Sequence, residues 1–200
     1  MKKWVSLLLV LLTLSLTGCT AVRINTKDID NIVDVVLSKD NKLYNHIGKG
    51  YKYYIPRGMT YIDTNEFNDK IYSDGKYYYL YIDAISYYHQ KETKYEKAQN
   101  SIYFREIQTD DKKGYIDIIE QDGKYLVEFM YNYARIESLV NKEDINDVIL
   151  NSSYILSTVK FNNNVIKILL DEDYFKYKEE KFELFEKVED KNENFLQYTE

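Results

Sequence analysis

Residues 51–140 are rich in Tyr, Ile and Val, and two Asp-Gly pairs, Asp74-Gly75 and Asp122-Gly123, interrupt them. β-Branched and aromatic residues favour extended strands. Asp and Gly tolerate positive φ angles, so an Asp-Gly pair between two strand-like runs favours a two-residue hairpin turn. The pattern predicts two hairpins, which pair 70–72 with 77–86 and 115–120 with 125–133, and further strands at 51–55 and 101–107.

Two segments with helical periodicity flank this strand-like region. Apolar residues recur every three to four positions in 26–38 and again in 141–159, so each segment has one apolar face. Each apolar face is expected to pack against another part of the fold, which removes it from water. The capping residues are expected to be Asn25 or Thr26 for the first helix, and Asn141 with Asp144, as an approximate capping box, for the second.

These elements predict an α+β fold, in which a twisted antiparallel sheet of five to seven strands carries an N-terminal and a C-terminal helix. With 200 residues the chain is long enough for one domain with a sizeable core. We place this domain at 25–170 and expect a further helical turn over 165–170. Residues 171–200 hold eleven acidic residues and five lysines, which predicts an acidic C-terminal segment whose last dozen residues are disordered.

The first 18 residues have the pattern of an export signal. Lys2 and Lys3 precede an apolar stretch, Trp4–Leu16, which is shorter than the roughly 20 residues of a membrane-spanning helix. The stretch ends at Leu16-Thr17-Gly18-Cys19, where small residues lead to the single Cys of the chain. This motif resembles the lipobox of bacterial lipoproteins.

The resemblance implies cleavage before Cys19, a diacylglyceryl thioether on its sulfur and, in the triacylated form, an N-acyl chain. Residues 19–24 would then be a lipidated tether, and no cofactor is expected beyond these covalent lipids. Two or three acyl chains make a durable anchor. The expected location is the outer face of a bacterial cell membrane.

Composition and motifs argue against several classes of function. The net charge of −6 does not suit a nucleic-acid partner, which requires clustered Lys and Arg. One Cys leaves no internal disulfide and no Cys-based zinc site. The chain has no G-x-S-x-G or H-E-x-x-H motif, and we expect His46 and His89 to be solvated loop residues.

The acidic clusters do not match a known site either. An EF-hand loop opening at Asp171 would need Gly and Glu where Lys176 and Phe182 stand. Asp110-Asp111 has the composition of a solvated turn. No metal site and no catalytic residue are therefore expected, although an acid pair from distant positions stays open.

Tyrosine is concentrated in and just before the strand-like region, because 18 of the 22 Tyr residues lie between Tyr44 and Tyr133. Alternate residues of a strand share a face, so Tyr77, Tyr79 and Tyr81 align on one side of the second hairpin strand. Rings with hydroxyl tips suit sugars and extended peptides. These three residues form the candidate ligand-binding face, and their alternative role is that of ordinary strand formers.

Tyr53-Tyr54-Ile55-Pro56-Arg57-Gly58-Met59 is similar to the first-strand signature of the PsbP-like domain family, with Met in place of the usual Trp. Tyr154-Ile155-Leu156-Ser157-Thr158-Val159-Lys160-Phe161 is similar to the end of its last helix. The resemblance covers about 45–165 and implies a non-catalytic binding domain.

Two functions stay open at this point. The first is a membrane-anchored, non-catalytic binding or accessory protein with another envelope protein as its partner. The alternative is a carbohydrate- or peptide-binding receptor, or a degradative enzyme, that uses the tyrosine face. The missing catalytic constellation and the short tether favour the first.

Overall fold

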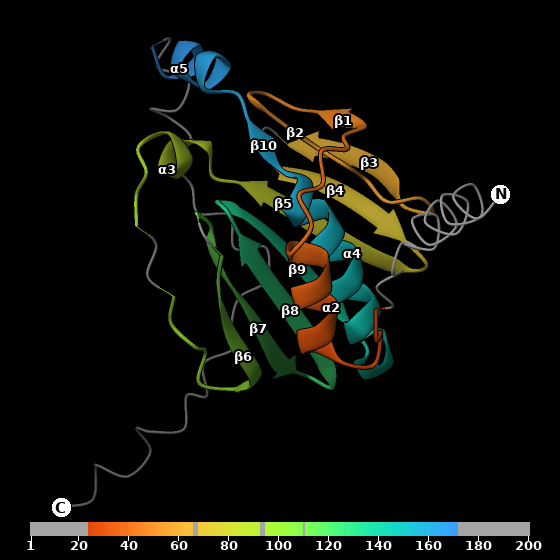
Figure 1. Ribbon diagram of the computed structural model, residues 1–200. Helices are drawn as coiled ribbons and strands as arrows, with labels where there is room; N and C mark the ends of the chain where they lie inside the picture. Colours follow the sequence, from red (N-terminus) through yellow and green to blue (C-terminus); the bar gives the residue numbers. More distant parts are fainter. Residues whose placement is uncertain (1–23, 66–67, 93–94, 110, 172–200) are drawn as a thin grey trace, which may run out of the picture.

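The computed structural model describes residues 24–65, 68–92, 95–109 and 111–171. Within these residues, ten strands form two antiparallel sheets, and four α-helices pack against them (Figure 1). This confirms the predicted α+β class, and the larger sheet has seven strands, the upper end of the expected range. The second sheet, of three strands, is an addition that the sequence pattern does not indicate.

The larger sheet has the strand order β3-β4-β5-β9-β8-β7-β6, so β3 and β6 form its edges. All neighbouring pairs are antiparallel. Its strands are β3 (Thr60–Asn65), β4 (Asn68–Ser73), β5 (Lys76–Ile82), β6 (Ser101–Gln108), β7 (Lys113–Gln121), β8 (Lys124–Tyr131) and β9 (Ala134–Val140).

The smaller sheet has the order β1-β2-β10 and joins a segment near the start of the domain to one near its end. Its strands are β1 (His46–Ile47), β2 (Tyr51–Tyr53) and β10 (Lys160–Phe161). The helices are α2 (Ile29–Leu37), α3 (Ala84–Tyr88), α4 (Ile145–Thr158) and α5 (Asn163–Asp171), with a 3-10 turn at Lys142–Asp144 before α4.

Both Asp-Gly pairs form the predicted hairpin turns. Their φ angles are 47° and 79° at Asp74-Gly75, and 50° and 75° at Asp122-Gly123, the positive values that such turns require. A third turn joins β8 to β9 at Asn132-Tyr133, with φ angles of 52° and 61°. The predicted strand over 125–133 is therefore wrong at its end, because a Tyr at positive φ is uncommon and gives no turn signal.

The predicted strand over 77–86 is also too long. β5 ends at Ile82, and the chain then turns into α3. Asp83 caps this helix, since its Oδ1 accepts a hydrogen bond from the Ser86 N–H at 2.8 Å. The short helix thus replaces the last part of the expected strand.

The two longer predicted helices are present, but their starts differ from the prediction. α2 begins after Asp28, whose carboxylate accepts hydrogen bonds from the backbone N–H groups of Asp30 at 3.0 Å and Asn31 at 3.3 Å. Asn141 makes no side-chain cap, and the 3-10 turn separates it from α4. The predicted capping box is therefore not formed. The segment over 165–170 is helical, as expected, within α5.

α2 and α4 lie side by side over one face of the larger sheet, across β8 and β9 (Figure 1). The apolar faces of both helices pack on the buried side chains of the sheet. Each large apolar side chain removed from water contributes about 1.5–3 kcal/mol. The core formed in this way includes Ile32, Val33, Val148 and Ile155 from the helices and Tyr78, Leu80, Phe129 and Ile136 from the sheet.

Arg105 of β6 fixes α2 to the edge of the larger sheet. Its guanidinium binds the carboxylates of Asp30, at 2.9 Å, and Asp34, and Tyr103 donates to Asp30 at 2.7 Å. Burial lowers the pKa of Arg105, but the hydrogen bond and charge of Asp34 outweigh this effect, so its pKa is raised overall. Ion pairs with β6 thus hold α2 on one side, and packing against α4 holds it on the other.

A buried carboxylate joins the two sheets. Asp69 of β4 is 2 % exposed, and its Oδ2 accepts hydrogen bonds from the hydroxyls of Tyr51 at 3.0 Å and Tyr53 at 2.8 Å, both from β2. Burial, and then the charge of Asp69, raise the pKa of both tyrosines well above the usual value. Both hydroxyls therefore stay protonated and serve as donors.

Within the described residues, none of the helices is both long and apolar enough to cross a bilayer. The predicted signal segment 1–18, Cys19 and most of the tether at 19–24 precede the first described residue. The acidic C-terminal segment 171–200 lies outside the described residues from 172 onward.

Replacing Asp69 with Ala is expected to destabilise the domain by about 3 kcal/mol, because two buried hydroxyls lose their acceptor. The free energy of unfolding from denaturant titration measures this. Glu106→Ala, on the exposed edge strand β6, is the control and should change that free energy by less than about 0.5 kcal/mol. Equal effects of the two changes would contradict the role given to Asp69.

Candidate functional site

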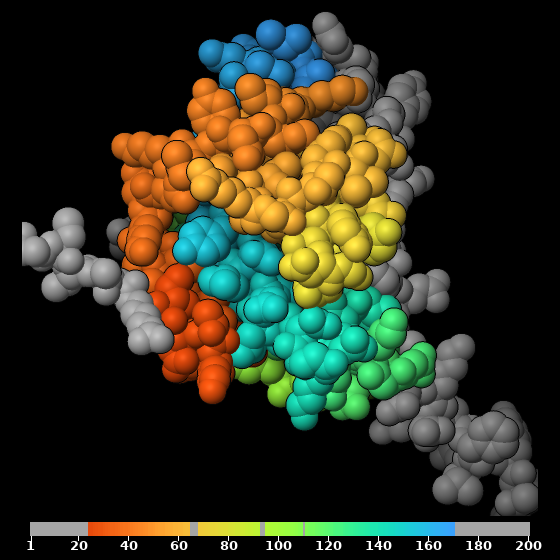
Figure 2. All heavy atoms as spheres, turned by 90° about the vertical axis from the view of Figure 1, so that its right-hand side faces the viewer, coloured from red at the N-terminus to blue at the C-terminus, as the bar shows by residue number. Residues whose placement is uncertain are grey.

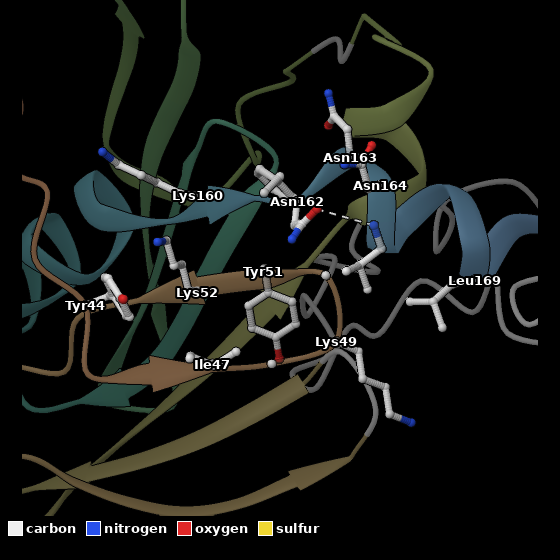
Figure 3. Close-up of a pocket in the computed structure, with 14 residues that line it drawn as sticks. Tyr44, Ile47, Lys49, Tyr51, Lys52, Lys160, Asn162, Asn163, Asn164 and Leu169 are labelled. Carbon is white, nitrogen blue, oxygen red and sulfur yellow. Dashed lines mark hydrogen bonds between the residues drawn. The ribbon is translucent and has the colours of Figure 1, made fainter.

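A groove of about 580 Å³ lies between the smaller sheet and the start of α5 (Figure 3). One wall comes from β1, β2 and the turn between them, and the other comes from β10 and the first residues of α5. The two walls are more than 100 positions apart in the sequence. The lining residues are Tyr44, Ile47, Gly48, Lys49, Gly50, Tyr51, Lys52, Lys160, Phe161, Asn162, Asn163, Asn164, Val165 and Leu169.

Gly50 lets the two walls approach each other. Its φ angle is +82°, and a Cβ built on it would lie 2.8 Å from Cγ1 of Ile166 in α5. Its carbonyl accepts a hydrogen bond from the Asn162 N–H at 2.8 Å. Only glycine combines this backbone conformation with so close a contact, so the β1–β2 turn determines where α5 begins.

The start of α5 is capped within the groove. The side-chain Oδ1 of Asn162 accepts a hydrogen bond from the Val165 N–H at 3.3 Å, the dashed line in Figure 3. The next residues, Asn163 and Asn164, also line the groove. On the other side of β10, the Phe161 ring stacks on Tyr87 with a centroid distance of 3.8 Å, which holds β10 against α3.

Three of the described lining residues are lysines and none is Asp or Glu. Lys52 Nζ lies 3.8 Å from the ring centroid of Tyr44, a cation–π contact that keeps the charge beside the groove. Lys160 Nζ lies 3.9 Å from Asp40, an exposed residue outside the lining. In a chain with a net charge of −6, this groove is a local concentration of positive charge.

The lining offers hydrogen-bond donors that suit an anion and lacks several of the commonest catalytic side chains. Lysine ammonium groups and asparagine amides donate hydrogen bonds, whereas the described lining contains no Ser, Cys, His, Asp or Glu that could act as nucleophile or general base. Within the described residues, no group of three or more His, Cys, Asp or Glu side chains is arranged to hold a metal ion. We call this site the lysine groove.

The predicted tyrosine face lies elsewhere, on β5. Tyr78, Leu80 and Ile82 point into the core, and the alternate residues Tyr77, Tyr79 and Tyr81 share the other face, as predicted. Tyr77 is 44 % exposed, while the other two are half-buried.

Charged side chains already contact these rings. Lys70 Nζ is 4.3 Å from the Tyr77 ring centroid and 5.5 Å from that of Tyr79. The guanidinium of Arg135 is 5.7 Å from the Tyr81 ring. The tyrosine face is therefore packed with side chains of neighbouring strands rather than presented as a row of open rings.

A row of buried carboxylates continues the tyrosine face across the sheet. Tyr79 is in register with Glu137, Glu137 with Glu128, and Glu128 with Asp117. All three carboxylates are buried. Arg135 binds Glu137 at 3.2 Å and approaches Glu128 at 3.8 Å. The row is an internal charge network of three adjacent strands.

Two further contacts complete this network. Tyr115 donates a hydrogen bond to Glu128, and the Ala98 N–H donates one to Asp117 at 3.0 Å. Sequence reasoning missed the row because its members are far apart in the chain. The available signal was a single acid in the middle of each apolar strand.

The two histidines differ from each other. His89 is exposed at the end of α3, as predicted. The prediction for His46 is wrong, because it belongs to β1 and its ring stacks on Tyr61 with a centroid distance of 4.4 Å. Its Nε2 lies 3.7 Å from Asp69. His46 thus extends the cluster that joins the sheets. Cys19, the predicted lipidation site, lies outside the described residues.

Comparisons of the chain with protein-family models, curated proteins and solved structures found no match. The two segments that suggested a PsbP-like domain lie together, since the Tyr54 N–H donates to Thr158 Oγ1 at 2.9 Å. Membership of that family stays a prediction. So do the envelope partner and the absence of enzymatic activity.

Gly50→Ala is expected to destabilise the domain more than Gly75→Ala. Both positions have φ angles near +80°, but a Cβ at Gly75 would meet nothing within 4 Å. Gly75→Ala therefore reports backbone strain alone, about 1–2 kcal/mol, and Gly50→Ala adds about 1–3 kcal/mol for the contact with Ile166. Thermal and denaturant unfolding measure the difference, and equal values would mean that α5 does not depend on this contact.

Proposed function

We propose that this chain is a lipid-anchored, non-catalytic binding protein at the outer face of a bacterial cell membrane, and that it binds a phosphate-bearing anion in the lysine groove. The observation that carries the proposal is the composition of this groove. Three lysines line it, and the described lining contains no Asp, Glu, His, Ser or Cys. The lipobox at Leu16-Thr17-Gly18-Cys19 supports the anchor.

A phosphate group suits the groove for three physical reasons. Lysine is a common ligand of phosphate, to which it presents a compact charge with three donors. Asn163 and Asn164 line the same groove, and their amides are further donors. The N-terminal end of α5 lies at the groove, and its helix dipole favours an anion there even though Asn162 already accepts from the Val165 N–H.

The expected affinity is modest, because the lysines remain in contact with water. A dissociation constant of about 1 mM corresponds to only about 4 kcal/mol of binding free energy. Salt should weaken the binding, since exposed charges are screened within roughly 10 Å at 0.1 M ionic strength. An anchored protein can use such an affinity because its ligands are concentrated at the same membrane.

Replacing Cys19 with Ala is expected to abolish incorporation of radioactive palmitate when the full chain is produced in a bacterial host, because the acceptor sulfur is lost. Thr17→Ser keeps the lipobox pattern and serves as the control, which should remain labelled. Undiminished labelling of the Cys19→Ala chain would refute the lipid anchor.

The groove is tested by calorimetric titration of glycerol phosphate into the mature protein at low salt. The double change Lys52→Gln and Lys160→Gln should weaken binding at least tenfold, because two of the three lining charges are removed. Lys124→Gln, at the exposed first residue of β8, removes one charge outside the groove and should leave binding unchanged. Equal losses in both variants, or no heat of binding at all, would contradict the proposal.

A further inference from the structure

The lysine groove is bordered by exposed apolar side chains. Eight large hydrophobic residues are exposed among the described residues, and five of them lie on two segments beside the groove. The most exposed is Ile47, at 71 %. The five are Leu43, Tyr44 and Ile47, which lead into and form β1, and Val165 and Ile168, on α5.

These two segments lie next to each other in space. Figure 2 shows the orange segment that contains β1 and β2 directly beside the blue helix α5, at one end of the molecule. Ile47 and Val165 line the same groove, from opposite walls. We call the five apolar residues the apolar rim.

Lysines accompany the apolar rim on both segments. Lys42 and Lys167 are exposed next to rim residues in the sequence, and Lys49, Lys52 and Lys160 line the groove between the segments. Near them, Asp40 lies 3.4 Å from Lys42 and 3.9 Å from Lys160. The surface therefore combines apolar side chains with an excess of positive charge.

This combination distinguishes a membrane surface from a protein partner. Protein–protein interfaces are depleted in lysine relative to the rest of the surface. At a bilayer, apolar side chains enter the boundary between head groups and acyl chains, while lysines extend along that boundary to anionic phosphates. α5 has the pattern of an interfacial helix, since Ile166 is buried in the protein and Val165, Lys167 and Ile168 face outward.

The predicted lipid anchor would hold the domain close to the bilayer. Cys19 precedes the first described residue, Ile24, by five positions, a reach of at most about 18 Å. The tether leaves the domain beside the start of α4, where Asn146 donates to the Thr26 carbonyl, and the groove lies beyond the other end of this helix, about 20 Å away. A domain held so close to the bilayer meets its surface at a high effective concentration.

We propose that the apolar rim docks the lysine groove onto an anionic lipid surface, and that the phosphate groups bound in the groove are those of lipid head groups. This inference rests on the proposed function and names the source of its ligand. The protein would then hold one fixed orientation on the membrane, with the groove facing the lipid and the tyrosine face of β5 left to other contacts.

Tryptophan fluorescence tests the docking, because the only Trp of the chain, Trp4, lies in the predicted signal segment and is absent from a chain cleaved before Cys19. Ile47→Trp places a probe on the rim, and Ile102→Trp places a matched probe on β6, where the side chain is also exposed. The mature protein is incubated with vesicles whose acyl chains are brominated, made of phosphatidylcholine with or without phosphatidylglycerol.

We expect the emission of the probe at position 47 to fall at least twofold in the phosphatidylglycerol vesicles and to change little in neutral ones. The probe at position 102 should stay unquenched in both. Adding Lys52→Gln and Lys160→Gln to Ile47→Trp should remove most of the quenching. Circular dichroism confirms that each variant is folded.

Equal quenching at both positions, or none at position 47, would overturn the inference. Titration with glycerol phosphate separates this failure from failure of the proposed function. If glycerol phosphate binds while position 47 stays unquenched, the groove takes a phosphate-bearing ligand that is not a membrane lipid. If neither is observed, the proposed function fails as well.

Discussion

The carboxylate of Asp69 accepts hydrogen bonds from Tyr51 and Tyr53, and this contact fixes the three-stranded sheet on the seven-stranded one. The smaller sheet has only two or three residues in each strand, too few to be stable alone. Its position is therefore set by the buried carboxylate and by the apolar core beneath it. Because β2 and β10 form the walls of the lysine groove, the groove depends on the same contact.

The seven-stranded sheet separates three regions with different roles. α2 and α4 cover one face and form the main core (Figure 1). The other face carries the tyrosines of β5 and the carboxylate row of Asp117, Glu128 and Glu137, an internal network of charges and hydrogen bonds. The lysine groove lies on neither face, but beyond the sheet, where β10 and α5 follow α4.

Local sequence signals were sufficient for the hairpins and for the two longer helices. Asp74-Gly75 and Asp122-Gly123 have few alternatives to a tight turn, and the apolar periodicity of α4 is strong. The turn at Asn132-Tyr133 was not predictable, since Tyr rarely adopts positive φ. The lysine groove was not predictable either, because its walls come from 44–52 and 160–169. No residue in either segment marks a site until β2 pairs with β10.

We propose that the lysine groove, rather than the tyrosine face, is the binding site. Amide chemical shifts of the isotope-labelled mature protein during addition of glycerol phosphate test this most directly, because they report every backbone position at once. We expect shift changes concentrated in 47–52 and 160–165. Changes centred on Tyr77, Tyr79 and Tyr81, or no change along the walls of the groove, would contradict it.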